Sequence, residues 1–479
     1  MQTRKIQSFL ILFAVGLLAG CGGSGDNVRT VTIDTQATYW DQYGAKSVGP
    51  QTYISTISIE RPGDARSYPA TLDASRLRWT ADDVPVGPYQ VRMTYTYGYQ
   101  LIVDVASGAS GLDLGMDLPG RAESQYVAQS TPVTLAFSGL SPWDPAADWF
   151  AALDWDAPPR IWPNLALKKG ATGGAASPLD WKGRKQVNPA DTLSFVQYRA
   201  SPIPSAPAGT YEIAVAAQSV TGIGMTDGVP LTIAVGMTPP AGTATVRVNW
   251  KQSQYAALLD ASGSKMSSYG SLGARLTAQS VASSSITLMQ LEPNSISDAD
   301  YGVLTYNRFL RAPNEEFLST TVEATVRRAL PGTTNTVAAW PTVSRFDPIG
   351  AIPDPLVPVI GPAVGVTVNG MNASQPVRGA GLTPTIAWQP PRIGTADIYF
   401  AYIMEVWANA DGADMKDIVG WYLSGTSLKV PAGLLEAGKF YLLYLTATSD
   451  PSGPGMAAPF RKGARGRGSA DFVSAVIEP

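Results

Sequence analysis

Two absences limit the chemistry that this chain can perform. The sequence has no histidine, and Cys21 is its single cysteine. Without histidine there is no Ser-His-Asp or Cys-His nucleophile, no imidazole acid–base group and no imidazole zinc ligand. Without a second cysteine there is no intrachain disulfide and no thiolate metal cage. An enzyme built on this sequence would depend on carboxylates, lysine, tyrosine or hydroxyl groups, and we expect no cofactor and no metal site.

Tryptophans are concentrated in one part of the chain, where five of the twelve lie between residues 143 and 181. Flat indole rings suit the apolar faces of sugars, and aspartates among them could accept hydrogen bonds from sugar hydroxyls. Four tryptophans are therefore candidate ligand-binding residues: Trp143, Trp149, Trp155 and Trp162. The alternative is that these large apolar side chains fill a core and its rim. The spacing of Trp149 and Leu153 also favours a short packed helix.

The aspartates of the same stretch are Asp144, Asp148, Asp154 and Asp156. Glycoside hydrolysis needs two carboxyl groups about 5 Å apart for retention, and somewhat farther apart for inversion. Proximity in sequence does not create that geometry, so no catalytic residue is assigned. An envelope enzyme that acts on polysaccharide with carboxylates between residues 121 and 346 stays the alternative to a non-catalytic protein.

Four basic residues lie close together near the end of the sequence: Arg461, Lys462, Arg465 and Arg467. They could bind lipid phosphates or an acidic polysaccharide, or they could form a solvated loop. The whole chain has a net charge of −3 and charged residues make up only 15% of it. This balance gives no basic excess to neutralise phosphates, so we expect no nucleic-acid partner.

Cys21 follows a pattern typical of export signals. Arg4 and Lys5 precede an apolar stretch, Phe9–Leu18, that is too short to span a bilayer as a helix. The residues Leu18-Ala19-Gly20-Cys21 come next and resemble the lipobox of bacterial lipoproteins at all four positions. This resemblance implies cleavage before Cys21 and attachment of acyl chains there, including palmitate. The alternative is an ordinary secretory signal with a chance cysteine.

Residues 21–27 then read as a flexible glycine-rich tether between the lipid and the first domain. Gly22 stands where an aspartate favours inner-membrane retention in enteric bacteria, so the resemblance implies an outer-membrane location. The expected partner is therefore the membrane itself, through the lipid anchor.

Short alternating segments, 47 glycines and 38 prolines indicate an all-β protein made of several domains. We predict a chain of β-sandwich domains of the immunoglobulin-like or fibronectin type III-like kind. The predicted divisions are a signal peptide (1–20), the tether (21–27), a first segment (28–120), a tryptophan-rich second segment (121–238), a third segment (239–346), a proline-rich linker (347–363) and a last segment (364–479).

Two segments carry family resemblances. Val84-Pro85 and Gly87-Pro88-Tyr89, within residues 79–97, resemble the turns of carboxypeptidase regulatory-like (transthyretin-like) domains. In the last segment, Trp388 and the spacing Leu435-x-Ala437-x-x-x-Tyr441 resemble fibronectin type III, although that family usually has proline where Ala437 stands. This second resemblance implies that Trp388 and Tyr441 are structural core residues. It also implies that the tyrosine hydroxyl bonds to the backbone before its corner.

Taken together, these patterns predict a lipid-anchored, non-catalytic cell-envelope protein. Its β-sandwich domains would bind another envelope protein or a polysaccharide, or would form a stable subunit of a larger assembly.

Overall fold

The computed structural model describes residues 27–479 with the exception of 42–43, 52, 62–63, 65, 76, 120–124, 155–164, 177, 190, 204–208, 262–267, 280–285, 310–314, 411, 451–454 and 462–467. Within these ranges the chain forms 35 strands, one α-helix and two short 3₁₀ helices, η1 (Ile349–Ala351) and η2 (Gly455–Ala457). The predicted all-β class is confirmed. Cys21 and the rest of the predicted signal and tether up to residue 26 lie outside the described residues.

The first segment is a sandwich of two sheets. One sheet contains β1 (Val28–Asp34), β6 (Thr71–Leu72), β7 (Arg78–Pro85) and β10 (Gly111–Asp113), and the facing strands are β4 (Ile54–Glu60), β5 (Ser67–Pro69), β8 (Tyr89–Tyr95) and β9 (Gln100–Val105). Burial alternates along β8, as expected for a strand with one face on a core. The core between the sheets includes Ile33, Ile59 and Val91. A third, small sheet is formed by β2 (Gln36–Asp41), β3 (Gly44–Pro50) and β11 (Asp117–Pro119).

The second segment also packs two sheets around one core. Its strands are β12 (Pro132–Ser138), β14 (Gly173–Ala175), β15 (Leu179–Asp180) and β18 (Leu231–Gly236) on one side, and β13 (Asp148–Asp154), β16 (Leu193–Pro202) and β17 (Gly209–Val220) on the other. Phe137, Phe150 and Phe195 meet between them, with the Phe137 and Phe150 ring centroids 4.4 Å apart. Residues 148–154 are thus an extended strand paired with β16, so the helix favoured by the spacing of Trp149 and Leu153 is wrong.

The third segment combines a curved sheet, a separate two-stranded sheet and the helix. The strands are β20 (Ser268–Gln279), β21 (Ile286–Pro293), β23 (Glu315–Ala329), β24 (Thr336–Ala339) and β25 (Thr342–Pro348), with the pair β19 (Gly242–Trp250) and β22 (Ala299–Arg308) and the helix α1 (Gln252–Ala261). Tyr255 and Leu259 of α1 are fully buried, which fixes the helix on the sheet. The carboxylate of Asp298 accepts a hydrogen bond from the Ser253 backbone at 2.9 Å, in the first turn of α1.

The last segment is again a sandwich. One sheet has β26 (Val364–Val368), β27 (Met371–Asn372), β29 (Thr385–Gln389) and β32 (Ser427–Lys429); the other strands are β28 (Val377–Arg378), β30 (Ile398–Asn409), β31 (Gly412–Leu423), β33 (Phe440–Ser449), β34 (Gly468–Val473) and β35 (Ile477–Glu478). Trp388 is 5% exposed and Tyr441 is 1% exposed. The hydroxyl of Tyr441 accepts a hydrogen bond from the Glu436 backbone N–H at 2.9 Å.

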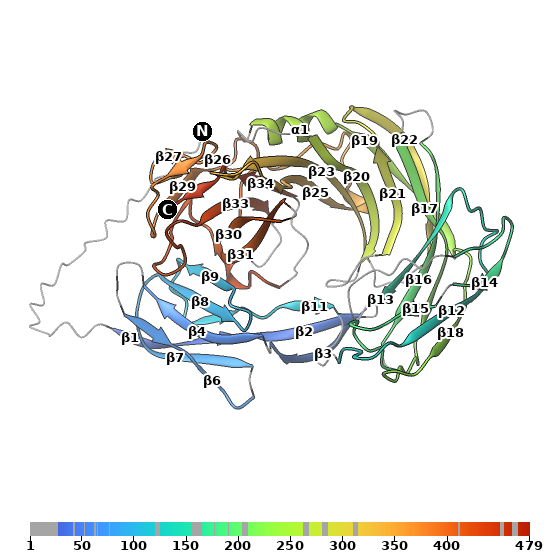
Figure 1. Cartoon of the computed structure of the whole chain (residues 1–479), viewed down its shortest axis with the longest axis horizontal. Helices are drawn as coiled ribbons and strands as arrows, with labels where there is room; N and C mark the ends of the chain where they lie inside the picture. Colours follow the sequence, from blue (N-terminus) through green and yellow to red (C-terminus); the bar gives the residue numbers. More distant parts are fainter. Residues whose placement is uncertain are drawn as a thin grey trace, which may run out of the picture.

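One continuous sheet of 18 strands runs through all four segments. The second segment joins the third where β17 pairs with β21, and the third joins the last where β25 pairs with β34. The last segment then joins the first through a parallel pairing of β31 with β9. The chain consequently runs around so that its first and last segments lie side by side, drawn blue and red in Figure 1.

The proline-rich stretch between the third and last segments is packed against the body of the protein. Leu356 and Ile360 are fully buried in the same core cluster as Trp388. Arg345 of β25 also donates a hydrogen bond to the Val357 carbonyl at 2.8 Å. In the described part of the chain, no helix has the length and apolar character needed to cross a bilayer.

Candidate functional site

The junction of β31 with β9 places side chains from the two ends of the chain on one sheet face. Trp421 pairs with Ile102, and both side chains are 1% exposed on the inner face of this sheet. Gly420 pairs with Leu101 on the opposite face. Because neighbours in register share a face, the opposite face combines residues of the first and last segments.

The hairpin between β8 and β9 supplies three tyrosines at alternate positions: Tyr95, Tyr97 and Tyr99. Gly98 adopts φ +88°, a left-handed conformation that glycine tolerates, and its N–H bonds to the Tyr95 carbonyl at 2.9 Å. The ring centroid of Tyr95 lies 5.5 Å from that of Tyr97 and 5.8 Å from that of Tyr99. Tyr53 also stacks on Tyr95, with ring centroids 6.1 Å apart.

Strands β30 and β31 of the last segment add further aromatic side chains beside these tyrosines. Phe400 of β30 lies 4.6 Å from Tyr422 of β31 between ring centroids, and Phe460 meets Tyr422 edge-on at 4.9 Å. Gly420 is needed here for space, because a Cβ atom at this position would lie 2.2 Å from the Tyr99 hydroxyl and 3.0 Å from the Phe400 ring.

These residues line a pocket of about 560 Å³ between the two segments, within the usual range for small-molecule sites. Its lining consists of Tyr53, Tyr95, Tyr97, Tyr99, Leu101, Met116, Phe400, Tyr422 and Phe460. We call it the aromatic pocket. No side chain in this lining carries a charge at neutral pH. Sequence patterns did not single it out, although the alternating tyrosines 95, 97 and 99 were visible.

The phenols of the aromatic pocket stay protonated at physiological pH. Burial raises the pKa of Tyr53 to about 12, with further increases from Tyr39 and Tyr97. Burial is also the main cause that raises the pKa of Tyr95, Tyr99 and Tyr422. The pKa of Tyr97 is raised mainly by burial and also by the negative charge of Asp417. These hydroxyls therefore act as neutral donors and acceptors, not as general bases.

Next to the pocket, Arg461 joins the last segment to the first. Its guanidinium bonds to the Asp113 carboxylate at 2.9 Å and to the Thr38 hydroxyl at 3.0 Å, and lies 3.5 Å from Asp117. Burial lowers the pKa of Arg461, but the surrounding aspartates outweigh it and raise the pKa overall. The expected anion-binding role is corrected for this residue, because its charge is already neutralised within the protein. The other members of that basic group, Lys462, Arg465 and Arg467, lie outside the described residues.

The tryptophans predicted to bind ligand do not form an exposed platform in the described residues. Trp143 is 4% exposed in the core of the second segment, so its ring has no free face for a sugar, and the expectation for this residue is corrected. Trp149 is half-buried and stacks on Tyr198 with ring centroids 4.1 Å apart. Trp155 and Trp162 lie outside the described residues.

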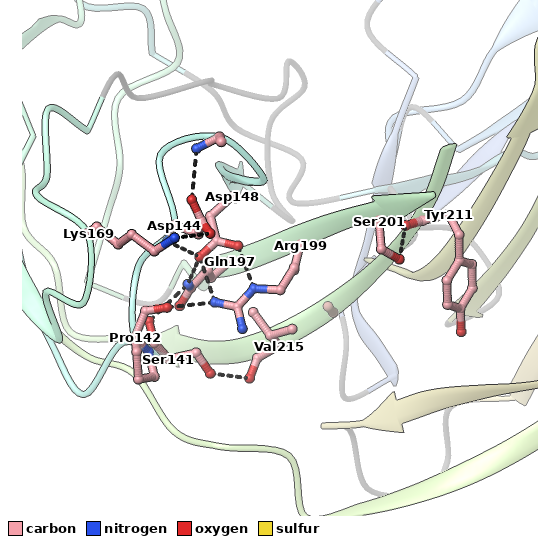
Figure 2. Close-up of polar contacts among 12 residues, drawn as sticks. Ser141, Pro142, Asp144, Asp148, Lys169, Gln197, Arg199, Ser201, Tyr211 and Val215 are labelled. Carbon is pink, nitrogen blue, oxygen red and sulfur yellow. Dashed lines mark hydrogen bonds and ion pairs between the residues drawn. The ribbon is translucent and has the colours of Figure 1, made fainter. Parts of the chain in front are cut away.

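The aspartates beside these tryptophans are held in structural contacts. Asp148 makes a two-pronged ion pair with Arg199 at 2.7 and 2.8 Å and accepts a bond from Gln197 at 2.8 Å, as Figure 2 shows. The backbone N–H of Ala146 and then Lys169 lower the pKa of Asp144. A glycosidase acid needs a raised pKa, so Asp144 is poorly suited to that role, and the carboxylate of Asp148 is already occupied by Arg199 and Gln197. Asp156 lies outside the described residues.

The described residues contain no group of three or more acidic, cysteine or histidine side chains that could hold a metal ion. No family model and no curated protein matches the chain.

Solved structures show only remote likeness. A candidate adhesin from Bacteroides ovatus ATCC 8483 is 8% identical, with 48% of this chain and 88% of that chain covered, at a TM-score of 0.14. A tetra-tandem repeat from the extending region of a large adhesion protein is 11% identical, with 92% of this chain and 99% of that chain covered, at a TM-score of 0.11. The BSP domain of a biofilm-associated protein is 9% identical, with 95% of this chain and 90% of that chain covered, at a TM-score of 0.11. At such TM-scores we draw no conclusion from the likeness.

Proposed function

We propose that this chain is a lipid-anchored, non-catalytic interaction protein of the bacterial cell envelope, held in the outer membrane through Cys21. The observation that carries the binding role is the aromatic pocket. It is open to ligands, lies where the two ends of the chain meet, and is lined by residues without a charge. Such a lining recognises a ligand but offers no nucleophile or general acid for neutral pH.

The anchor rests on the lipobox-like residues Leu18 to Cys21 and the glycine-rich tether that follows. Two or three acyl chains give stable attachment, whereas one chain gives only marginal binding. The β-sandwich segments would then present the aromatic pocket at a distance from the lipid, as a rigid platform and not as separate mobile modules.

The lipid anchor is tested by Cys21→Ser in cells grown with radiolabelled palmitate. We expect labelled wild-type protein in the membrane fraction and no label in the variant, because the thioether carrying the diacylglycerol requires the cysteine sulfur. A second variant, in which residues 1–21 are replaced by a cleavable secretory signal, should be exported, folded and released from membranes. Palmitate label in the Cys21→Ser protein, or a membrane-bound secreted form, contradicts the anchor.

A catalytic role would show itself separately. Turnover of envelope polysaccharide by the purified protein that is lost in Asp144→Asn would overturn the non-catalytic assignment.

A further inference from the structure

We propose that the aromatic pocket binds a neutral saccharide. This inference rests on the proposed function and adds the chemical class of the ligand. Three observations carry it: the stacked rings, the unpartnered phenol hydroxyls and the uncharged lining.

The rings supply flat apolar surfaces on two sides of the pocket. Tyr97 and Tyr99 are stacked with an interplanar angle of 9°, and Phe400 and Tyr422 lie on the adjoining strands β30 and β31 of the last segment. Tyr97 is 65% exposed, so one face of its ring is open to a ligand. The C–H faces of a pyranose ring are apolar and flat, and they match surfaces of this kind.

The hydroxyls supply polar contacts that the protein itself leaves open. Within the described residues, the hydroxyls of Tyr53, Tyr95, Tyr97, Tyr99 and Tyr422 make no hydrogen bond to the protein. Each neutral phenol both donates and accepts. A saccharide presents alternating donors and acceptors around its ring, so it can use this set in both directions.

Other ligand classes use less of the site. A proline-rich peptide also packs on aromatic grooves, but its carbonyls accept and do not donate, which leaves the acceptor capacity of the phenols unused. An anion finds no cation in the lining, since the nearby Arg461 is paired with Asp113. A quaternary ammonium ion would gain cation–π contacts but would leave the phenol hydroxyls without partners.

The test uses the full chain in a polyoxyethylene detergent, which has neither a sugar nor a quaternary ammonium headgroup. Cellobiose, maltose and N,N′-diacetylchitobiose oligomers are titrated by calorimetry, with a proline-rich decapeptide and choline as the competing classes. We expect at least one saccharide to bind. Tyr97→Ala should weaken that binding about tenfold through loss of the ring contact, and Tyr99→Phe should weaken it about threefold through loss of one hydroxyl.

Tyr126→Ala is the matched control, because Tyr126 is 63% exposed and lies outside the pocket. It should leave the affinity within about twofold of the wild type. Absence of saccharide binding, equal losses in Tyr97→Ala and Tyr126→Ala, or Tyr97-dependent binding of the peptide or choline instead, each overturns the saccharide assignment. These outcomes leave the palmitate-labelling result untouched, so failure of this inference and failure of the lipid anchor are distinguishable.

Discussion

At the scale of single residues, Asp471 shows how a carboxylate links two segments. It lies on β34, between β25 and β33. Its oxygens accept hydrogen bonds from the Thr342 backbone and hydroxyl, both at 2.9 Å, and from the Thr446 hydroxyl at 2.8 Å. Burial nonetheless raises the pKa of Asp471, because desolvation outweighs these three bonds.

Because its pKa is raised in the folded state, Asp471 lowers the free energy of unfolding as the pH rises. Between the unfolded pKa and the higher folded pKa, the native state holds a proton that the unfolded state has lost. The free energy of unfolding therefore decreases by about 1.4 kcal/mol per pH unit in that window, above about pH 4. Asp471→Asn should reduce the measured slope and should be at least as stable as the wild type at neutral pH, as measured by urea unfolding from pH 4 to 8; burial also raises the pKa of Asp104, Glu323 and Asp417, so part of the slope remains.

Asp414→Asn, a change of an exposed carboxylate on β31, is the control and should keep the wild-type slope. A slope in Asp471→Asn equal to that of the wild type would assign the pH dependence to other groups.

The tryptophan-rich stretch in the sequence suggested a sugar-binding surface, whereas the aromatic pocket is formed by other residues. Tryptophans close together in sequence were candidates because proximity is visible there. Trp143 instead fills a core, since a large apolar ring is stabilised most by burial. The wall formed by Phe400 and Tyr422 could not be associated with Tyr97 beforehand, because no local pattern reports a pairing between strands about 300 residues apart.

At the scale of elements, the segment around η2 connects the last sandwich to the first. Arg461 follows η2 and places its guanidinium, with its side chain 19% exposed, against β10 and β2. Phe460 beside it closes one side of the aromatic pocket. The segment thus combines a polar contact and an apolar contact at one junction.

Arg461→Ala is expected to lower the free energy of unfolding by about 2–3 kcal/mol, because it leaves Asp113 and Asp117 close together without their counter-charge. The matched control is Arg378→Ala, since the Arg378 side chain is 76% exposed and lies 3.8 Å from Glu478. We expect no measurable change there. Both variants are compared by urea unfolding at neutral pH, and equal effects would show that the Arg461 contacts carry no stabilisation.

The sequence predicted which stretches form strands more reliably than it predicted which strands pair with each other. Short alternating segments predicted an all-β protein, and burial alternates along β1, β4 and β8 in the structure. The stretch 148–154 was mistaken for a helix because Trp149 and Leu153 fit both periods. This stretch forms a strand because it pairs with β16. That pairing is a tertiary contact, which the local sequence does not reveal.

At the scale of the whole molecule, the 18-stranded sheet couples segments that sequence patterns treat as separate domains. Hydrogen bonds between β31 and β9 belong equally to the first and the last segment. Loss of either strand leaves the other with an unpaired edge and exposes Trp421 or Ile102.

We therefore predict that β9 and β31 open together. Hydrogen exchange followed by mass spectrometry in increasing urea should show Gln100–Val105 and Gly412–Leu423 losing protection at the same denaturant concentration. The pair β12–β18 lies in another sheet and packs in a separate core cluster, so it serves as the internal reference. Exchange of β9 well below the transition of β31 would mean that the first and last segments unfold independently.

The parallel pairing of β31 with β9 also dictates an order of events during biogenesis. Val103 is translated about 320 residues before its partner Tyr422, which corresponds to roughly 15–60 s of synthesis. Throughout that interval the first segment has a hydrophobic strand edge with no neighbour. If Cys21 is acylated before the last segment is available, this unpaired edge is held at the membrane surface. Until the last segment is present, the edge of β9 is therefore exposed to pairing with strand edges of other chains.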